Sequence, residues 1–193
     1  MIEFQNVSKL YGDKEALSNL NLQIENGEIM GLIGHNGAGK STTSSYDLTS
    51  SDLETSLARL LNVFDFAENR YQVIETFSHG MRQKVFVIGA LLSDPDIWVL
   101  DEPLTGLDPQ AAFDLKQMMK EHAQKGKTVL FSTHVLEVAE QVCDRIAILK
   151  KGHLIYCGSV EDLRKDYPDQ SLESIYLSLA GRKEEVSDAS QGH

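Results

Sequence analysis

The chain has 193 residues, of which 24% are charged and 41% are hydrophobic, close to the averages of globular proteins. This length predicts one domain that buries its own core. A formal net charge of −11 disfavours nucleic acid and anionic lipid as direct partners, because their phosphates would be repelled. The two cysteines suit a reducing cytoplasm. The sequence shows no signal peptide, and no apolar run approaches the roughly 20 residues that cross a bilayer.

The first third of the chain has the pattern of β-strands. Apolar and polar residues alternate over 19–24, which predicts a strand with one buried face. Asn26-Gly27 follows and predicts a hairpin turn. The apolar run over 29–33 then predicts a short buried strand that ends at a glycine.

The rest of the chain alternates between helical and strand patterns. The predicted elements are helices over 53–64 and 81–92, a buried strand over 98–100, a helix capped by Asp108-Pro109 and ended by Gly126, a strand over 128–132, a helix over 135–142, a hairpin of 145–149 with 153–157, a helix over 160–167 capped by Ser159, and a last helix over 171–179. This alternation indicates an α/β fold with a largely parallel sheet.

The most informative segment follows the first buried strand and fits the pattern G-x-x-x-x-G-K-[ST]. It consists of Gly34, His35, Asn36, Gly37, Ala38, Gly39, Lys40 and Ser41. Its glycines allow the backbone to curl so that N–H groups, from Gly37 to Thr42, point at phosphate oxygens. Lys40 would reach the β- and γ-phosphates, and the Ser41 hydroxyl would bind Mg²⁺. The sequence therefore predicts a nucleotide site.

Two carboxylates form the second part of this predicted site. Asp101 and Glu102 end the buried strand over 98–100. A carboxylate at this place can hold Mg²⁺ through water, and the next one can polarise an attacking water molecule. Asp101 is therefore a candidate metal ligand and Glu102 a candidate general base.

Two further segments carry a resemblance to a known family. Residues 77–83, with the sequence FSHGMRQ, resemble the signature loop of ATP-binding cassette (ABC) ATPases, whose usual core is LSGGQ. This segment precedes Asp101-Glu102, as it does in that family. Residues 104–108 resemble the family's D-loop.

Two single residues complete the resemblance. His134 follows a predicted strand and resembles the family's switch histidine. Tyr11 lies upstream of the phosphate loop, where the family carries an aromatic side chain that stacks on adenine. The resemblance covers about residues 1–165, and the hairpin and short helices after His134 are similar to those of bacterial exporter ATPase subunits.

The resemblance implies a P-loop NTPase core with a largely parallel sheet and an N-terminal antiparallel β part. It implies an ATPase domain over residues 1–181, with a helical subdomain at about 44–92, and leaves 182–193 as a disordered polar tail. It also implies that ATP and Mg²⁺ bind, that Glu102 and His134 are catalytic, and that Asp108 reaches across a dimer. The signature residues would contact the ATP of the partner subunit; they are Ser78, His79, Gly80 and Met81.

The chain departs from the family pattern in two places. His79 stands where the family usually has glycine, although Ser78 and Gly80 remain. Only 38 positions separate Lys40 from Ser78, and similar chains carry several tens more there, including the Q-loop glutamine that contacts Mg²⁺ and faces the membrane partner. We therefore expect that the chain joins, near Thr43-Ser44, two segments that are not neighbours in the complete protein; a deletion is the alternative.

The function that these motifs imply is ATP hydrolysis by a cytoplasmic subunit that powers transport through separate membrane subunits, most similar to an exporter. Two such subunits, identical or different, would sandwich two ATP molecules. A soluble ABC-type ATPase acting on DNA or ribosomes is a second hypothesis, disfavoured by the charge of −11 and by the lack of coiled-coil insertions or zinc sites. A nucleotide-binding regulator that does not hydrolyse ATP is a third, which the missing glutamine favours.

Overall fold

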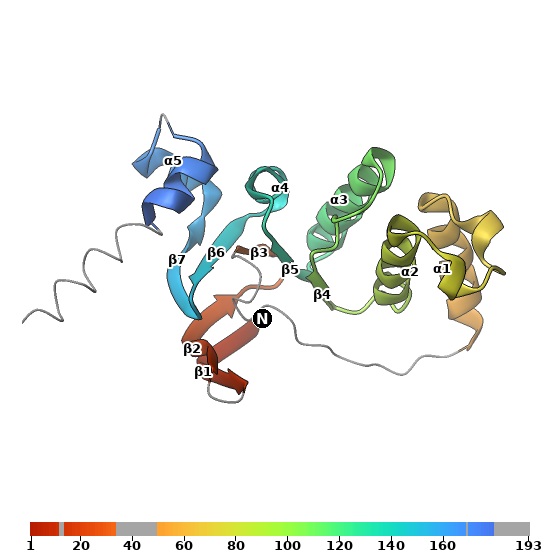
Figure 1. The fold of residues 1–193 in the computed structure, drawn as a ribbon, viewed down its shortest axis with the longest axis horizontal. Helices are drawn as coiled ribbons and strands as arrows, with labels where there is room; N and C mark the ends of the chain where they lie inside the picture. The colour runs from red at the N-terminus through yellow and green to blue at the C-terminus, as the bar shows by residue number, and fades with distance from the viewer. Residues whose placement is uncertain (12–13, 34–49, 169, 180–193) are drawn as a thin grey trace, which may run out of the picture.

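The computed structural model describes residues 1–11, 14–33, 50–168 and 170–179, and these form two sheets with helices around them (Figure 1). Strands β1 (Ile2–Tyr11) and β2 (Lys14–Ile24) make a two-stranded antiparallel sheet. The larger sheet has the order β4-β5-β3-β6-β7. Its strands are β3 (Ile29–Ile33), β4 (Ile97–Asp101), β5 (Thr128–Thr133), β6 (Arg145–Lys150) and β7 (His153–Ser159). β3, β4, β5 and β6 are parallel, whereas β7 runs antiparallel to β6.

The helices follow the order that the sequence predicts. They are α1 (Ser50–Val63), α2 (His79–Leu91), α3 (Pro109–Gln124), α4 (Leu136–Val142) and α5 (Val160–Asp166), with short 3-10 turns η1 (Ala67–Asn69) and η2 (Ile74–Thr76) between α1 and α2. Residues 172–179 form one further helical segment. In the described part of the chain, no helix is both long and apolar enough to cross a membrane.

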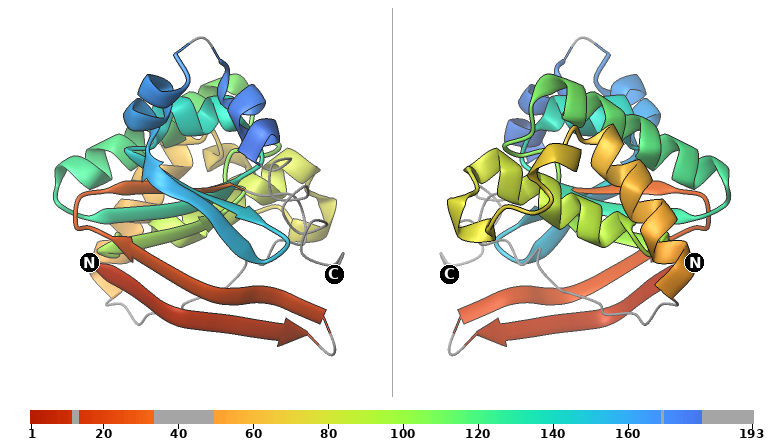
Figure 2. Two further views of the ribbon diagram at one scale, coloured as in Figure 1. Left: turned by 90° about the vertical axis from the view of Figure 1, so that its left-hand side faces the viewer. Right: turned by 90° about the vertical axis from the view of Figure 1, so that its right-hand side faces the viewer.

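The core lies on both faces of the larger sheet. On one face, Trp98, Leu100 and Phe131 pack with residues of α1, α2 and α3. On the other, Met30 and Leu130 pack with β2, and so the small sheet lies against the large one, as both views of Figure 2 show. A third apolar cluster joins β6 to α4, α5 and the segment 172–179.

Most predicted elements are confirmed with their ends moved by at most two residues, but α1 begins three residues earlier than predicted and β2 five residues earlier. The fold class is confirmed: an α/β fold with a largely parallel sheet and an antiparallel N-terminal part. Asp108 caps α3 by accepting a hydrogen bond from the Ala111 N–H at 2.9 Å, and Gly126 follows the helix with a φ of +79°. Ser159 caps α5 in the same way, with its Oγ 2.9 Å from the Asp162 nitrogen.

Two predictions about strands are wrong. Asn26-Gly27 forms a turn but not a hairpin, because β2 pairs with β1 whereas β3 enters the larger sheet between β5 and β6. The stretch 98–100 is not buried throughout, since Val99 is 45% exposed. Here β4 lies at the edge of the described sheet, and one of its two faces is left without cover.

Candidate active site

Three parallel strands bring the predicted site residues to one edge of the sheet. Ile33 at the end of β3 pairs with Thr133 of β5, and Asp101 at the end of β4 pairs with Ser132. Because parallel strands end at the same edge, the chain continues from that edge into Gly34, Glu102 and His134. Ligand sites of open α/β sheets lie at such carboxyl ends.

Glu102 and His134 contact each other directly. The His134 Nδ1 lies 2.9 Å from the Glu102 Oε2. The His134 side chain is 52% exposed and that of Glu102 is 22% exposed. The pair therefore lies at the surface, with the carboxylate more shielded from solvent than the imidazole. Glu102 has a φ of +45°, a left-handed conformation that is uncommon outside glycine and that is found at functional sites. The backbone is therefore turned at the residue that was predicted as the base.

Ser132 links the two adjacent carboxylates to β5. Its hydroxyl donates a hydrogen bond to the Asp101 Oδ1, and its Oγ accepts one from the Glu102 backbone N–H at 3.0 Å. One serine thus orients both Asp101 and Glu102. The Thr105 hydroxyl lies 3.4 Å from the Glu102 Oε2 and faces the same carboxylate.

The donor set at this edge fits Mg²⁺ better than a transition metal. The described residues contain no group of three or more His, Cys, Asp and Glu side chains that could hold a metal. Mg²⁺ does not need one, because it is usually bound by one or two protein oxygens together with water and substrate phosphates. The Asp101 carboxylate, held by Ser132, would be an oxygen ligand of this kind.

The predicted signature residues begin a helix. Ser78 is the N-cap of α2, and its Oγ accepts a hydrogen bond from the Met81 N–H at 3.3 Å. Ser78 and His79 are exposed, whereas Gly80 and Met81 are half-buried. The start of α2 therefore presents its partial positive charge at the surface, as an anion site requires.

Asp108, the predicted D-loop residue, has two partners. Besides capping α3, its carboxylate lies 2.8 Å from the Lys84 Nζ of α2. The Ala111 N–H and the Lys84 ammonium both favour the charged carboxylate and lower the pKa of Asp108. The residue is thus held in one orientation at the start of α3.

The remaining predicted site residues are Tyr11, in the small sheet, and the phosphate loop, which the structure does not describe. Tyr11 ends β1, where its Cα pairs with that of Lys14. The whole phosphate loop, Gly34 to Thr42, and the join expected near Thr43-Ser44 lie outside the described residues. The structure thus brings together Asp101, Glu102 and His134. The place of the phosphate loop is inferred only from the sequence, in which it follows β3.

The sequence analysis missed the side chains that hold these residues. The sequence predicts Ser132 only as the end of a strand, and it predicts no contact of Gln83, Lys84 or Thr105 with Glu102 or Asp108. Their signal is weak, because each is a common polar residue whose partner is 3 to 30 residues away in the chain. The pairing of Asp101 with Ser132 in register was the one relation that a strand alignment could have shown.

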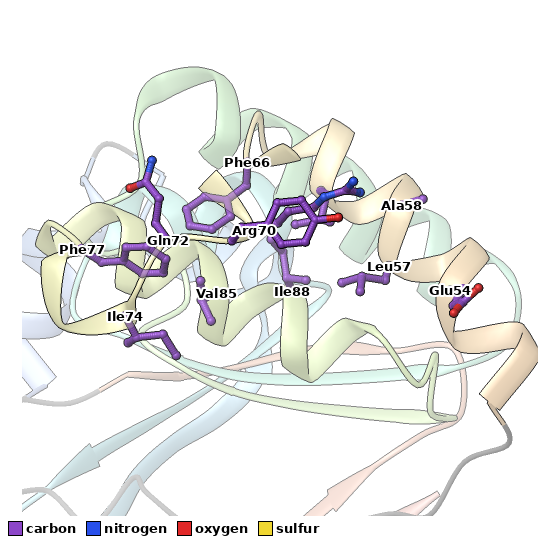
Figure 3. A pocket seen from close by; sticks show the side chains of 12 residues that line it. Glu54, Leu57, Ala58, Phe66, Arg70, Gln72, Ile74, Phe77, Val85 and Ile88 are labelled. Carbon is purple, nitrogen blue, oxygen red and sulfur yellow. The ribbon is translucent and has the colours of Figure 1, made fainter. Parts of the chain in front are cut away.

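A hollow lies between α1 and α2. It has a volume of about 570 Å³ and is lined mainly by apolar side chains, including Leu57 of α1 and Ile88 of α2. Figure 3 shows these side chains pointing into the groove, with Arg70 above them. Phe66 and Phe77 meet edge to face at its end, 5.3 Å apart.

Comparison with protein families agrees with this geometry. The family model described as "ABC transporter" matches residues 17–46. A second model, described as "AAA domain, putative AbiEii toxin, Type IV TA system", matches residues 54–140. A solved structure described as the ATP-binding subunit of an ABC transporter superposes with a TM-score of 0.81 at 27% identity, covering 92% of this chain and 98% of that one. The fold and the polar edge define a P-loop ATPase of the cassette class.

Curated relatives define the family. An uncharacterized ABC transporter ATP-binding protein of Methanocaldococcus jannaschii is 32% identical, over 84% of this chain and 79% of its own length. A Nod factor export ATP-binding protein of Burkholderia orbicola is 30% identical, over 82% and 70%. The chain belongs to the family of ABC transporter ATP-binding proteins.

The alignments also bear on the short spacing between Lys40 and Ser78. The alignment with the Methanocaldococcus protein runs over 206 positions, although 84% of 193 residues is only about 162. About 44 positions of that relative therefore have no counterpart in this chain, and the Burkholderia alignment of 214 positions over 82% leaves about 56. The chain is therefore shorter than the aligned part of these relatives, and a segment missing between Lys40 and Ser78 would account for the difference.

Proposed function

We propose that this chain binds and hydrolyses MgATP and that hydrolysis drives export through separate membrane subunits. The observation that carries the proposal is the Glu102–His134 pair, 2.9 Å apart at the carboxyl edge of the parallel sheet. That edge is also where β3 leads into the phosphate-loop sequence. A carboxylate and an imidazole beside a phosphate site are the groups that water activation requires.

In this mechanism Glu102 accepts the proton of the water that attacks the γ-phosphate. The left-handed backbone of Glu102 and the hydrogen bond from its N–H to Ser132 fix the carboxylate at the sheet edge. His134 already holds the Glu102 carboxylate, and from the same place it would contact the γ-phosphate and the water. Positioning of water and base is the main chemical task, since phosphoryl transfer needs little covalent help.

Nucleotide and metal would be held by residues on both sides of the same edge. Lys40 and the N–H groups of the phosphate loop would bind the β- and γ-phosphates, with Tyr11 stacked on adenine. Ser41 and Asp101 would hold Mg²⁺, which supplies charge neutralisation to the phosphates. Ser132 would keep Asp101 oriented, because its hydroxyl donates to that carboxylate.

A second subunit would complete each site. Ser78, His79 and Gly80 begin α2 at the surface of the molecule, and in a sandwich dimer they would contact the γ-phosphate held by the partner. Asp108 would reach across the same interface. Closing and opening of the dimer would then couple ATP hydrolysis to conformational change in the membrane subunits.

The membrane partners would be separate proteins on whose cytoplasmic side this subunit sits. The apolar groove between α1 and α2 supports such docking, because its rim carries exposed apolar side chains such as Tyr71 and Ile74, 83% and 58% exposed. Export as the direction is supported by the Burkholderia relative, whose name describes Nod factor export.

The Glu102→Gln variant tests the proposal. The substitution keeps the shape of the side chain and removes the base, so ATP binding should persist while turnover falls by about 10²–10⁴-fold. With MgATP, the variant should accumulate as a dimer in size-exclusion chromatography, because the sandwich would open only after hydrolysis.

The matched control is Glu121→Gln, an exposed carboxylate on α3, which should turn over ATP like the wild type. Wild-type turnover in the Glu102→Gln protein would show that Glu102 is not the base. Absence of turnover in the wild type, with ATP bound, would favour the nucleotide-binding regulator instead.

We further propose that the complete protein carries a segment between Thr43 and Ser44, with the Q-loop glutamine. The support is the surplus of 44 or more alignment positions in the relatives. Sequencing the gene product across these two positions checks it directly, and a continuous Thr43-Ser44 junction would leave a true deletion.

A further inference from the structure

The first two turns of α2 lie against the loop that connects β4 to α3. Gln83 lies one turn after the signature residues, and its Nε2 donates to the backbone carbonyls of Glu102 and Pro103, both at 3.3 Å. These contacts are half-buried. The helix that begins with the signature residues therefore holds the backbone of the proposed base.

Lys84, the next residue of α2, contacts the far end of the same loop. Its Nζ lies 2.8 Å from the Asp108 Oδ2, and the Lys84 side chain is only 15% exposed. An ion pair with one partner so shielded is screened less than a surface pair. Gln83 and Lys84 thus bind both ends of the 102–108 loop from one face of α2.

Glycines allow this close approach. A Cβ on Gly80 would lie 2.8 Å from the Gly106 carbonyl oxygen, too close for any other residue without a shift. A Cβ on Gly106, which has a φ of +79°, would lie 2.8 Å from the His79 Cδ2. The His79 ring, which stands where the family usually has glycine, therefore occupies space that Gly106 leaves open.

We infer that Gln83 and Lys84 are positioning residues that couple the signature helix to the catalytic loop within one subunit. The inference rests on the proposed function, in which the start of α2 contacts the partner's ATP and Glu102 activates water. When the partner's nucleotide binds Ser78 and Gly80, it shifts the start of α2. The shift is transmitted to Glu102 by the Gln83 amide and to Asp108 by the Lys84 ammonium. ATP in one site is thereby linked to the geometry of the base in the other.

The physical reason is the strained backbone at Glu102. A left-handed φ at a non-glycine residue persists only when its surroundings hold it. Several contacts hold Glu102 here. Its N–H donates to the Ser132 Oγ, and its carbonyl accepts from the Gln83 amide and from the Thr105 N–H. Its carboxylate contacts His134 and the Thr105 hydroxyl. Loss of the Gln83 amide weakens the hold on the Glu102 carbonyl, which then depends on the Thr105 N–H, so the peptide relaxes and the carboxylate moves. A shift of about 1 Å costs about 10²-fold in rate.

The test compares Gln83→Met and Lys84→Met in the full chain, measuring kcat, the dissociation constant of ATP and the melting temperature. Both substitutions keep the length and helix propensity of the side chain but remove the donor or the charge. We expect kcat to fall by about 10- to 100-fold, with ATP affinity within about twofold of wild type. Lys84→Arg, which retains the charge, should restore most of the rate.

Gln117→Met and Lys120→Met on the exposed side of α3 are the matched controls, and they should leave kcat unchanged. Wild-type kcat in Gln83→Met and Lys84→Met overturns the inference and leaves the proposed function intact. A parallel loss of melting temperature and ATP affinity also overturns it, because the side chains would then serve structure alone. A wild-type protein without turnover means that the proposed function itself has failed.

Discussion

β4 and β5 are adjacent parallel strands that end in the same site, yet their surroundings differ. All six residues of β5 are buried, because it lies between β4 and β3 and has cover on both faces. β4 alternates between buried and exposed residues, with Trp98 at 4% and Val99 at 45% exposure. No strand of the described chain pairs with its outer edge.

The difference is confined to one face of the sheet. Trp98 and Leu100 pair with Val129 and Phe131, and all four are buried on the face that α3 covers. Val99 pairs with Leu130 on the opposite face, where Leu130 has cover from β2 but Val99 does not. The described residues thus cover both faces of β5 but only one face and one edge of β4.

The largest expected effect is in the core beneath β5. Phe131→Ala should destabilise the protein by about 3–5 kcal/mol. The Phe131 side chain is 0% exposed, so its removal leaves a cavity in the core. Denaturant unfolding measures the change. A decrease in unfolding free energy below 1 kcal/mol would mean that Phe131 is packed as loosely as Val99.

The pH dependence of stability probes the covered face of β4, where His122 packs against Trp98. The imidazole stacks on Trp98 with centroids 3.9 Å apart, it is 2% exposed, and its Nε2 has no partner among the described residues. Burial lowers the pKa of His122 from 6.5 to about 4. The unfolded chain therefore binds the proton more readily, so stability is complete above about pH 6.5 and falls as the pH drops toward 4.

This loss should amount to at most about 3.5 kcal/mol, at about 1.4 kcal/mol for each unit of pKa shift. Unfolding experiments at pH 7.5, 6 and 5 measure it. His122→Phe keeps the stack on Trp98 and should flatten the dependence between pH 6.5 and 4. An equally steep dependence in this variant would assign the effect to other groups.

Ser132 tests the link between the two strands. Ser132→Ala removes the hydroxyl that contacts both the Asp101 carboxylate and the Glu102 N–H, and it should cost about 1–2 kcal/mol of stability. Turnover should fall as well, because both carboxylates lose a fixed orientation. Ser174→Ala, at an exposed serine of the helical segment 172–179, is the control. An equal loss of stability and turnover in that variant would mean that Ser132 has no specific role in the site.

Val99 should show the smallest effect. Val99→Ala removes little buried area in the chain as it stands and should change stability by less than about 0.5 kcal/mol. If the complete protein carries the missing segment and that segment covers β4, the same substitution there should cost about 1–2 kcal/mol. Equal small values in both proteins would place the segment elsewhere.

The sequence by itself determined the elements and the family. Periodicity located the strands and helices, since each segment's apolar spacing matches one type of secondary structure. The caps at Asp108 and Ser159 were also local, because the side chain and the N–H that it accepts from lie three residues apart. The motifs for phosphate, metal and base were local as well, and the same local pattern placed Asp101 and Glu102 at a strand end.

The tertiary structure decided what no local pattern contains. Asn26-Gly27 has the sequence of a hairpin turn, but strand pairing across the sheet made it a crossing between two sheets. Val99 lies in an apolar run, but β4 is an edge strand of the described sheet, and Val99 is 45% exposed. Ser132, Gln83 and Lys84 contact Glu102 or Asp108 from other elements, and such contacts depend on how strands and helices are arranged in space. Residue type and spacing therefore indicate which side chains do chemistry, whereas strand order and helix packing decide which side chains hold them.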